Sequence, residues 1–290
     1  MSSGVLLLDK ASGLSSAAAL ARVKRKLSIA KIGHAGTLDP MASGLLVCLV
    51  NSATRLASFA QQGTKIYSGS IEFGLVTGTD DITGEILERS DQLPEFSQVL
   101  AATAPFVGNI TQIPPRVSAI KIDGVRSYDR ARNGEEFELM ARPVRVDYFE
   151  VEPESERRVR FRIQCSKGTY IRSLARDLGA ALGCGGCLAS LRREATIPFT
   201  IDGAKTFENV SLADIMSWDV LFPNVIKAEV DDFAATRLLR GEKRALLDIS
   251  ERLGEQTSEH AIYYRQGSSK PLGLLRRIPD AWDYALNIGE

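Results

Sequence analysis

The chain has 290 residues, a formal net charge of +0 and 44% hydrophobic residues, a composition typical of a globular protein with a substantial core. It contains no apolar run long enough to cross a bilayer and no signal-peptide pattern, so we expect a soluble, cytoplasmic protein. Its four cysteines do not form the pattern of a disulfide framework in a chain of this length.

The neutral total hides two stretches of opposite charge. Residues 1–60 contain only Asp9 and Asp39 as acidic residues among many lysines and arginines, whereas residues 61–115 are acidic. A basic patch can attract a polyanion at zero net charge, because the local field steers the encounter. Charge alone leaves open whether the basic run 22–26 binds nucleic acid or is simply the solvated face of a helix.

The first half of the chain predicts alternating strands and helices. The apolar run 4–9 predicts a short buried strand, and residues 15–27 predict a helix with Ser15 or Ser16 as its N-cap. Residues 44–50 are continuously apolar, which periodicity cannot assign to a strand or to a helix start. Alternation over residues 65–74 predicts another strand.

Residues 95–107 predict a helix that stops at Pro105. The next segment, residues 111–137, has the composition of a long exposed excursion, with a hairpin turn at Asp123–Gly124. A short basic helix closed by Asn133–Gly134 is expected within it.

The second half begins with a predicted strand hairpin over residues 142–153 and 157–168. Residues 169–182 predict an amphipathic helix, and residues 211–223 predict a further helix. Residues 229–290 have the composition of a small, separate β-rich unit.

Few motifs in the chain carry recognisable chemistry. The Cys184-Gly-Gly-Cys187 sequence lacks the second ligand pair of a zinc site and follows a predicted helix, unlike redox motifs, so we interpret it as structural. No phosphate-binding glycine motif is present. Asp80 and Asp81 could approach Asp39 in space, but their acidic loop would repel a phosphate backbone.

The stretch GHAGTLDPMASGLL, residues 33–46, combines His34 and a single Asp39 with small residues before an apolar run. An aspartate before a proline is common in turns, so the local sequence favours a structural role for Asp39 as a turn residue. The alternative is that Asp39 has a chemical role as a single carboxylate, since no second acid, metal-ligand motif or cofactor motif accompanies it.

This stretch resembles the signature loop of the TruB family of tRNA pseudouridine synthases, which modify uridine 55 in the T arm of tRNA. Further segments resemble motifs of the same family and follow in the family's order. They are LLLDKASGLSS at 6–16, KIYSGSIEFG at 65–74, the insertion at 112–134, CSKGTYIRSLARDLG at 165–179 and LASLRREA at 188–195. The first motif departs from the usual Lys-Pro of the family, because this chain has Lys10-Ala11.

The resemblance implies an α+β pseudouridine synthase fold, with a mixed, mainly antiparallel sheet flanked by helices and loops. It implies a catalytic domain over residues 1–225 with an RNA-binding insertion at about 108–145. Residues 226–290 resemble the small, β-rich PUA-like C-terminal domain of bacterial members more loosely.

The resemblance also implies roles for individual residues. Asp39 would be the catalytic carboxylate, and Arg172 would pair with it and orient it. Tyr67 would stack on the target base and assist late proton removal, while Tyr170 and Leu191 would line the uracil pocket. His34 would fill the space that the uridine leaves when it flips out of the RNA stack, so we assign it no acid–base work.

Positively charged residues would bind the RNA backbone of a flipped-out uridine. The candidates are Lys10, Lys24, Arg116, Lys121, Arg126, Arg130, Arg132 and Arg192, with Arg193 beside the last. Gly36 and Gly44 would let the loop backbone approach the RNA. We expect tRNA as the partner, no metal, no cofactor, no membrane, no obligate protein partner and a monomer.

Two alternatives remain at this level. The protein could be an RNA-binding folding factor for tRNA whose catalysis is dispensable, or a pseudouridine synthase that acts on another RNA. The residues also leave open whether the carboxylate attacks C1′ or removes the 2′ proton to give a glycal.

Overall fold

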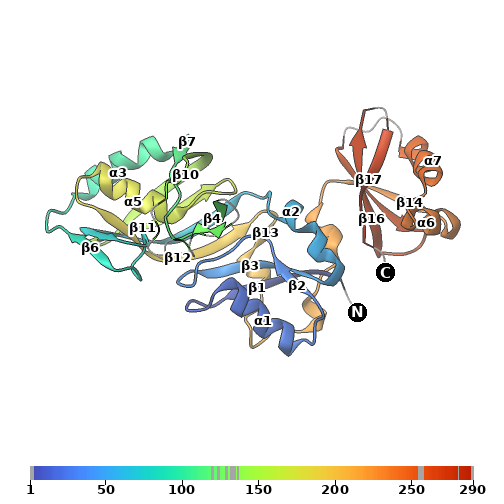
Figure 1. The fold of residues 1–290 in the computed structure, drawn as a ribbon, viewed down its shortest axis with the longest axis horizontal. Helices are drawn as coiled ribbons and strands as arrows, with labels where there is room; N and C mark the ends of the chain where they lie inside the picture. The colour runs from blue at the N-terminus through green and yellow to red at the C-terminus, as the bar shows by residue number, and fades with distance from the viewer. Residues whose placement is uncertain are drawn as a thin grey trace.

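The structure is a computed structural model that describes residues 3–118, 121–122, 125–127, 130, 135, 137–253, 258–279 and 281–288. Figure 1 shows an elongated molecule, with a large α+β part toward one end and a small C-terminal domain at the other. The predicted α+β architecture is confirmed.

A mixed sheet forms the centre of the large part. Within the described residues it has nine strands, in the order β1-β3-β12-β4-β11-β10-β7, with β2 beside β3 and β13 beside β12. The strands are β1 (Gly4–Lys10), β2 (Ile32–His34), β3 (Ser43–Val50), β4 (Lys65–Phe73), β7 (Gly108–Gln112), β10 (Arg142–Ser155), β11 (Arg158–Cys165), β12 (Gly186–Thr196) and β13 (Phe199–Thr200). The run 44–50 is therefore a strand, and its unbroken apolar sequence reflects burial on both faces.

Strand β12 joins the two halves of this sheet. It is antiparallel to β4 along nearly its whole length, whereas it meets β3 in parallel only at Arg192 and Arg193. Because side chains alternate along a strand, Leu191 and Arg193 share one face and Arg192 takes the other.

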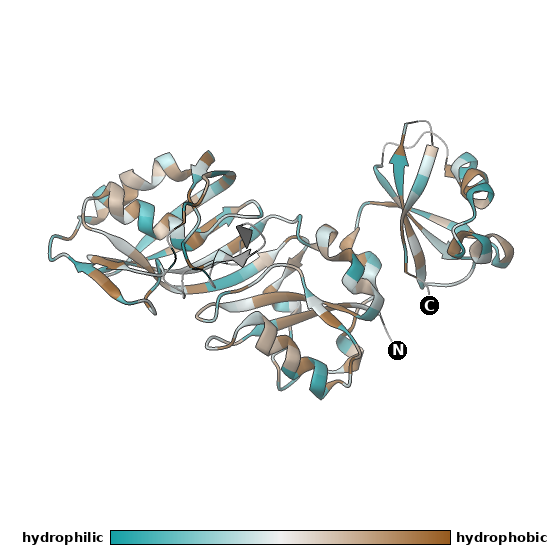
Figure 2. Ribbon diagram, in the orientation of Figure 1, coloured by the Kyte–Doolittle hydropathy of each residue, from teal (hydrophilic) through white to brown (hydrophobic). Residues whose placement is uncertain are grey.

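Helices flank the sheet, and hydrophobic and hydrophilic residues alternate along them (Figure 2). They are α1 (Ser16–Lys26), α2 (Ala57–Ala60), α3 (Phe96–Thr103) and α5 (Ile171–Ala181), with 3₁₀ turns at Asn51–Leu56, Ala104–Phe106 and Ile201–Gly203. Ser15 caps α1, because its hydroxyl accepts the Ala18 N–H at 3.1 Å. In α5 the predicted apolar positions Ile171, Leu174 and Leu178 are buried in the main hydrophobic cluster.

The predicted helix at 211–223 is wrong. Two short 3₁₀ turns, Leu212–Asp214 and Trp218–Leu221, stand in its place. Between them, the backbone N–H and C=O of Met216 are hydrogen-bonded to Val5 of β1 at 2.8 and 2.9 Å. Those bonds use the groups that a continuous helix would need for its own ladder.

Two small hairpins lie outside the main sheet. Strands β5 (Leu75–Thr77) and β6 (Ile86–Arg89) flank the acidic loop, and β8 (Lys121–Ile122) pairs with β9 (Val125–Arg126) in the insertion. The second pairing fits the hairpin turn predicted from the sequence. The short basic helix predicted after it falls largely outside the described residues.

The C-terminal domain has its own four-stranded sheet and hydrophobic core. Its elements are β14 (Ile226–Val230), α6 (Asp232–Leu239), α7 (Lys243–Leu253), β15 (His260–Arg265), β16 (Pro271–Ile278) and β17 (Ala281–Asn287). A separate apolar cluster joins this domain to the large part. In it, the rings of Phe59 and His260 meet edge to face with centroids 5.4 Å apart.

Candidate active site

The loop that carries Asp39 connects β2 to β3. Hydrogen bonds from the turn after β1 and from the first residue of α1 fix its backbone. The Ser16 hydroxyl accepts the Leu38 N–H at 2.8 Å and donates to the Leu38 carbonyl at 2.9 Å. Beyond Asp39, the Gly13 N–H donates to the Pro40 carbonyl at 2.8 Å. The backbone on both sides of Asp39 is therefore fixed, which limits where its carboxylate can lie.

Gly44, where β3 begins, is explained by packing against protein rather than RNA. Its φ is +99°, and a Cβ there would lie 2.4 Å from the carbonyl oxygen of Arg193. Only glycine lets β12 approach β3 this closely. The predicted role of Gly44 in admitting RNA is therefore wrong.

Arg172 contacts the Asp39 carboxylate from the first turn of α5. Its Nε lies 2.9 Å from Asp39 Oδ2, without the alignment of a directed hydrogen bond, so the contact is an ion pair. Nη1 and Nη2 donate to the carbonyls of Thr79 and Val117 at 2.9 and 3.0 Å. The arginine side chain is 5% exposed and the aspartate 34%, so a fixed buried cation meets a carboxylate that remains accessible.

A second carboxylate lies behind the arginine. Asp81 Oδ2 is 3.8 Å from Arg172 Nη1, and Asp80 pairs with Arg176 at 2.8 Å. The acidic loop thus approaches the site, as the sequence allowed. Its charges are matched by arginines, so the expected repulsion of a phosphate backbone is reduced.

A cavity of about 240 Å³ opens beside Asp39. Its lining comes from the loop that carries Asp39, from β4 and β12, from the start of α5 and from the insertion. The residues are Gly36, Thr37, Leu38, Asp39, Lys65, Tyr67, Ser118, Gly168, Thr169, Tyr170, Ile171, Arg172, Leu191 and Arg193. Five residues that the sequence analysis named for the site, Asp39, Tyr67, Tyr170, Arg172 and Leu191, thus share one cavity.

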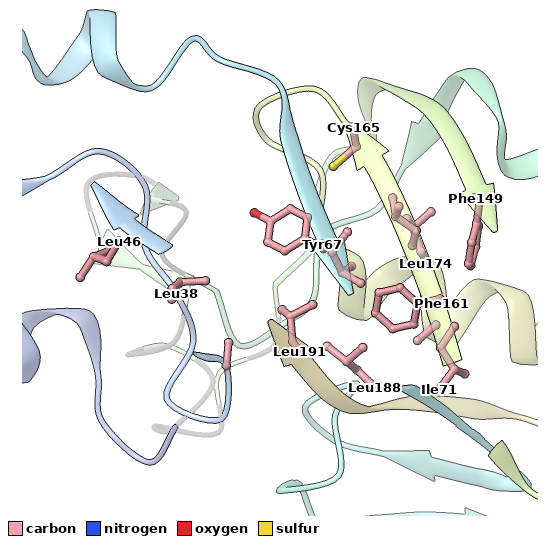
Figure 3. Close-up of a cluster of buried hydrophobic side chains, with 14 of the residues drawn as sticks. Leu38, Leu46, Tyr67, Ile71, Phe149, Phe161, Cys165, Leu174, Leu188 and Leu191 are labelled. Carbon is pink, nitrogen blue, oxygen red and sulfur yellow. The ribbon is translucent and has the colours of Figure 1, made fainter. Parts of the chain in front are cut away.

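Tyr67 and Leu191 belong both to the main hydrophobic cluster and to the cavity wall. Figure 3 shows the Tyr67 hydroxyl pointing away from Phe161 and Leu174. Burial raises the pKa of the Tyr67 phenol, so it remains protonated at neutral pH. Leu191 therefore belongs both to the core and to the cavity wall, while its contact with uracil stays a prediction.

Two buried cations complete the wall. Lys65 Nζ donates to the carbonyls of Gln61 and Gly63 at 3.1 and 2.9 Å, and burial lowers the pKa of this lysine to about 8. Arg193 donates to the carbonyls of Leu45 and Gly36 at 2.7 and 3.1 Å. Because Arg193 is fully buried among these carbonyls, its predicted contact with the RNA backbone is wrong.

Tyr170 is fixed through its backbone. Its N–H donates to Gln112 Oε1 at 2.8 Å, and Gln112 Nε2 donates to the Tyr170 carbonyl at 3.0 Å. Gln112 ends β7, where the insertion begins, so the insertion and the start of α5 are connected by two hydrogen bonds.

Comparison with known proteins agrees with this geometry. Residues 24–171 match the family described as TruB family pseudouridylate synthase (N terminal domain), and residues 172–220 match the tRNA pseudouridylate synthase B C-terminal domain. The chain belongs to the TruB family. It is therefore a pseudouridine synthase, an isomerase.

Individual relatives and solved structures are also similar to this TruB family member. It is 41% identical to tRNA pseudouridine synthase B of Brucella melitensis, over 85% of this chain and 77% of the relative. It is 42% identical to the protein of the same name from Thermobifida fusca, over 99% and 94%. A crystal structure of a Cbf5-Nop10-Gar1 complex superposes with a TM-score of 0.71 at 23% identity, covering 98% of this chain and 84% of that one, which shows a shared fold.

His34 of this TruB family member lies on β2 and does not line the cavity. Burial lowers the pKa of its imidazole, so the ring is neutral at pH 7. Neither the expected absence of acid–base work nor the role as a wedge in the RNA stack is tested by this, and both stay predictions.

The residues predicted to bind the RNA backbone of this TruB protein have different surroundings. Lys10 is only 1% exposed, and its Nζ donates to the carbonyls of Ala11 and Leu14, which contradicts a phosphate contact. Lys24 is exposed on α1. Arg192 makes two hydrogen bonds to the Asp9 carboxylate.

The insertion holds the other predicted RNA contacts. Arg116 is exposed and lies 5.4 Å from the centre of the Phe137 ring. Arg130 pairs with Glu135 at 3.5 Å. The side chains of Lys121 and Arg126, and all of Arg132, lie outside the described residues.

Sequence reasoning missed Lys65 and Ser118, which line the cavity. It named Arg193 only as an RNA contact and Asp81 only as a possible neighbour of Asp39, whereas Arg193 lines the cavity and Asp81 supports Arg172. The strand period contained a signal for Lys65 and Arg193, since Lys65 lies two residues before Tyr67 and Arg193 lies two after Leu191.

No group of three or more His, Cys, Asp or Glu that could hold a metal occurs among the described residues. The four cysteines are buried and free, as expected for a structural role. In the part of the chain that the structure describes, no helix has the length and apolar character needed to span a membrane.

Proposed function

We propose that this TruB family member isomerises uridine 55 in the T arm of tRNA to pseudouridine, with Asp39 as the catalytic carboxylate. The observation that carries the proposal is the ion pair between accessible Asp39 and buried Arg172 at a cavity lined by Tyr67 and Leu191. The name tRNA pseudouridine synthase B, borne by the relatives, supports tRNA as the substrate.

The proposed isomerisation needs few chemical groups from the protein. The N1–C1′ bond of the nucleotide breaks, the base turns, and a C5–C1′ bond forms, so no atom enters or leaves overall. Asp39 either attacks C1′ or removes the 2′ proton, and both routes need one correctly placed carboxylate. Arg172 holds that carboxylate in place and cannot itself act as a base.

The remaining cavity groups hold the detached base. Tyr67 presents a buried aromatic ring for stacking, and Leu191 supplies an apolar wall. A uridine within a folded loop must leave its stack to enter the cavity, which costs a few kcal/mol. Contacts of exposed basic residues with phosphates offset that cost, and the protein is expected to work in the cytoplasm as a monomer without a partner protein.

The test maps pseudouridine in a T-arm stem-loop treated with purified wild-type protein and with Asp39→Asn. Asn keeps the size of the side chain but removes its charge, so we expect the rate to fall by about 10³-fold or more with RNA affinity retained. Asp91→Asn is the matched control, because this carboxylate is fully exposed and lies outside the cavity lining.

Full turnover by Asp39→Asn would remove Asp39 from the mechanism. Modification of a different uridine would keep the enzyme class and change the target. Rescue of a deletion strain by inactive Asp39→Asn would identify the folding-factor alternative as the dominant role.

A further inference from the structure

Ser118 is a buried polar residue on the cavity wall that has no role in the proposed reaction. It is 5% exposed and lies in the insertion, directly after Val117, whose carbonyl accepts from Arg172. Its backbone position is therefore coupled to the Asp39–Arg172 pair.

The Ser118 hydroxyl has no hydrogen bond of normal geometry to any described residue. The Tyr170 hydroxyl lies near enough to interact with it, but the two do not meet the geometry of a hydrogen bond. A buried hydroxyl left without a partner is unfavourable, because it has given up its hydrogen bonds to water and gained none in return. Such a group at the wall of a cavity is one that a bound molecule can satisfy.

We infer that Ser118 binds the polar edge of the pyrimidine base that enters the cavity. A hydroxyl both donates and accepts, and uracil presents carbonyl oxygens and an N–H along one edge. The inference rests on the proposed function, because it takes the ligand to be a flipped uridine.

This contact gives the insertion a second task. The exposed Arg116, two residues before Ser118, is placed to meet the RNA backbone. Ser118 itself faces the base cavity. The insertion would thus bind RNA with its exposed side and complete the base pocket with its buried side.

The experiment measures RNA affinity in an Asp39→Asn background, so that bound RNA is not converted. Two T-arm stem-loops are compared, one with uridine at the target position and one with an abasic ribose there. We expect Ser118→Ala to weaken binding of the uridine RNA about 5- to 10-fold, the effect of one lost hydrogen bond, and to leave the abasic RNA within 2-fold.

Thr196→Val is the matched control. Thr196 is also buried with a hydroxyl that has no hydrogen-bond partner among the described residues, yet it lies outside the cavity lining. It should leave both affinities unchanged, and Ser118→Thr should keep most of the affinity for the uridine RNA.

Equal weakening on both RNAs would overturn the inference, because Ser118 would then act on the shape of the insertion. No weakening on either RNA would overturn it as well. Failure of the proposed function is a separate result, since it appears as absence of pseudouridine with the protein that retains Asp39.

Discussion

At the scale of single residues, the position of Asp39 depends on hydrogen bonds from a side chain outside the cavity lining. Ser16 makes two of them, both to Leu38 and both at 2.8–2.9 Å. Ser16 is therefore a positioning residue, and its neighbour Ser15, which caps α1, offers a comparison at the same place in the chain.

Ser16→Ala should lower kcat about 10-fold with KM unchanged, because Leu38 loses its anchor and the Asp39 carboxylate loses its fixed position. Ser15→Ala should cost about 1 kcal/mol of stability, as the loss of a helix cap does, with kcat retained. Steady-state kinetics and thermal unfolding of both variants test this. A similar loss of kcat in Ser15→Ala would mean that general loosening of α1 causes the effect, and Ser16→Thr should restore activity.

Lys10 predicts a pH dependence of stability. Burial lowers the pKa of this lysine from 10.5 to about 8, so the unfolded chain binds more protons than the folded one between these values. The Lys10 contribution is absent below about pH 8 and grows as the pH rises toward 10.5, by up to about 3 kcal/mol.

Chemical denaturation of wild type and Lys10→Met across pH 7–10.5 isolates this contribution, because both proteins share the same tyrosines and cysteines. The stability of wild type relative to the variant should increase with pH. Lys24→Met, which changes an exposed lysine of the neighbouring helix, should show a flat difference. A flat difference for Lys10→Met would contradict the prediction.

The resemblance to the family's motifs, and not residue types or strand period, assigned Asp39, Tyr67, Arg172 and Leu191 to one site, and the structure places all four on one cavity. The same reasoning failed for Lys10 and Arg193, whose charges suggested RNA contacts. Lys10 is buried against carbonyls of the turn that follows β1, and Arg193 is buried against a carbonyl of β3 and a carbonyl of the loop before it. A sequence shows a positive charge but not the carbonyls that fold around it, and so it overstates the number of cations available to RNA.

At the scale of elements, the insertion is both a predicted excursion and part of the site. Replacing residues 119–134 by a short glycine linker should weaken T-arm RNA binding about 10-fold and flatten its salt dependence, because phosphate contacts are lost. The melting temperature should change little, since loops carry few core contacts. Fluorescence titration at several salt concentrations measures the RNA affinity and its salt dependence, and thermal unfolding measures the melting temperature.

A deletion that begins at residue 116 is the informative comparison. It also removes the Val117 carbonyl that Arg172 uses, so kcat should fall in addition to affinity. Global unfolding of the shorter deletion would show that the segment belongs to the core.

Element boundaries were predicted well where one period dominates, as in α1, β4 and α5. The error at 211–223 arose because the local pattern resembles a helix while Met216 pairs with β1 from the far side of the sequence. Long-range backbone pairing of this kind overrides local propensity and leaves no periodic signal.

At the scale of the whole molecule, three of the four apolar clusters among the described residues bear on the site and on the two parts of the protein. One cluster lies under the active site, a second lies inside the C-terminal domain, and a third joins the two parts through residues such as Phe59 and Phe222. The two rings of that pair meet edge to face at 5.4 Å. The C-terminal domain is thus held by hydrophobic contact as well as by the linker (Figure 1).

Strand β12 determines when the protein becomes competent during its synthesis. Strands β3 and β4 leave the ribosome first, but the position between them is filled only by residues 186–196. Until those residues emerge, two half-sheets present open edges, which are sites where chains pair wrongly. The cavity also lacks Leu191 and Arg193 during this period, so its wall is incomplete. The strand that joins the two halves of the sheet is therefore also the strand that completes the cavity wall, and of the described strands only the short β13 joins the sheet after it.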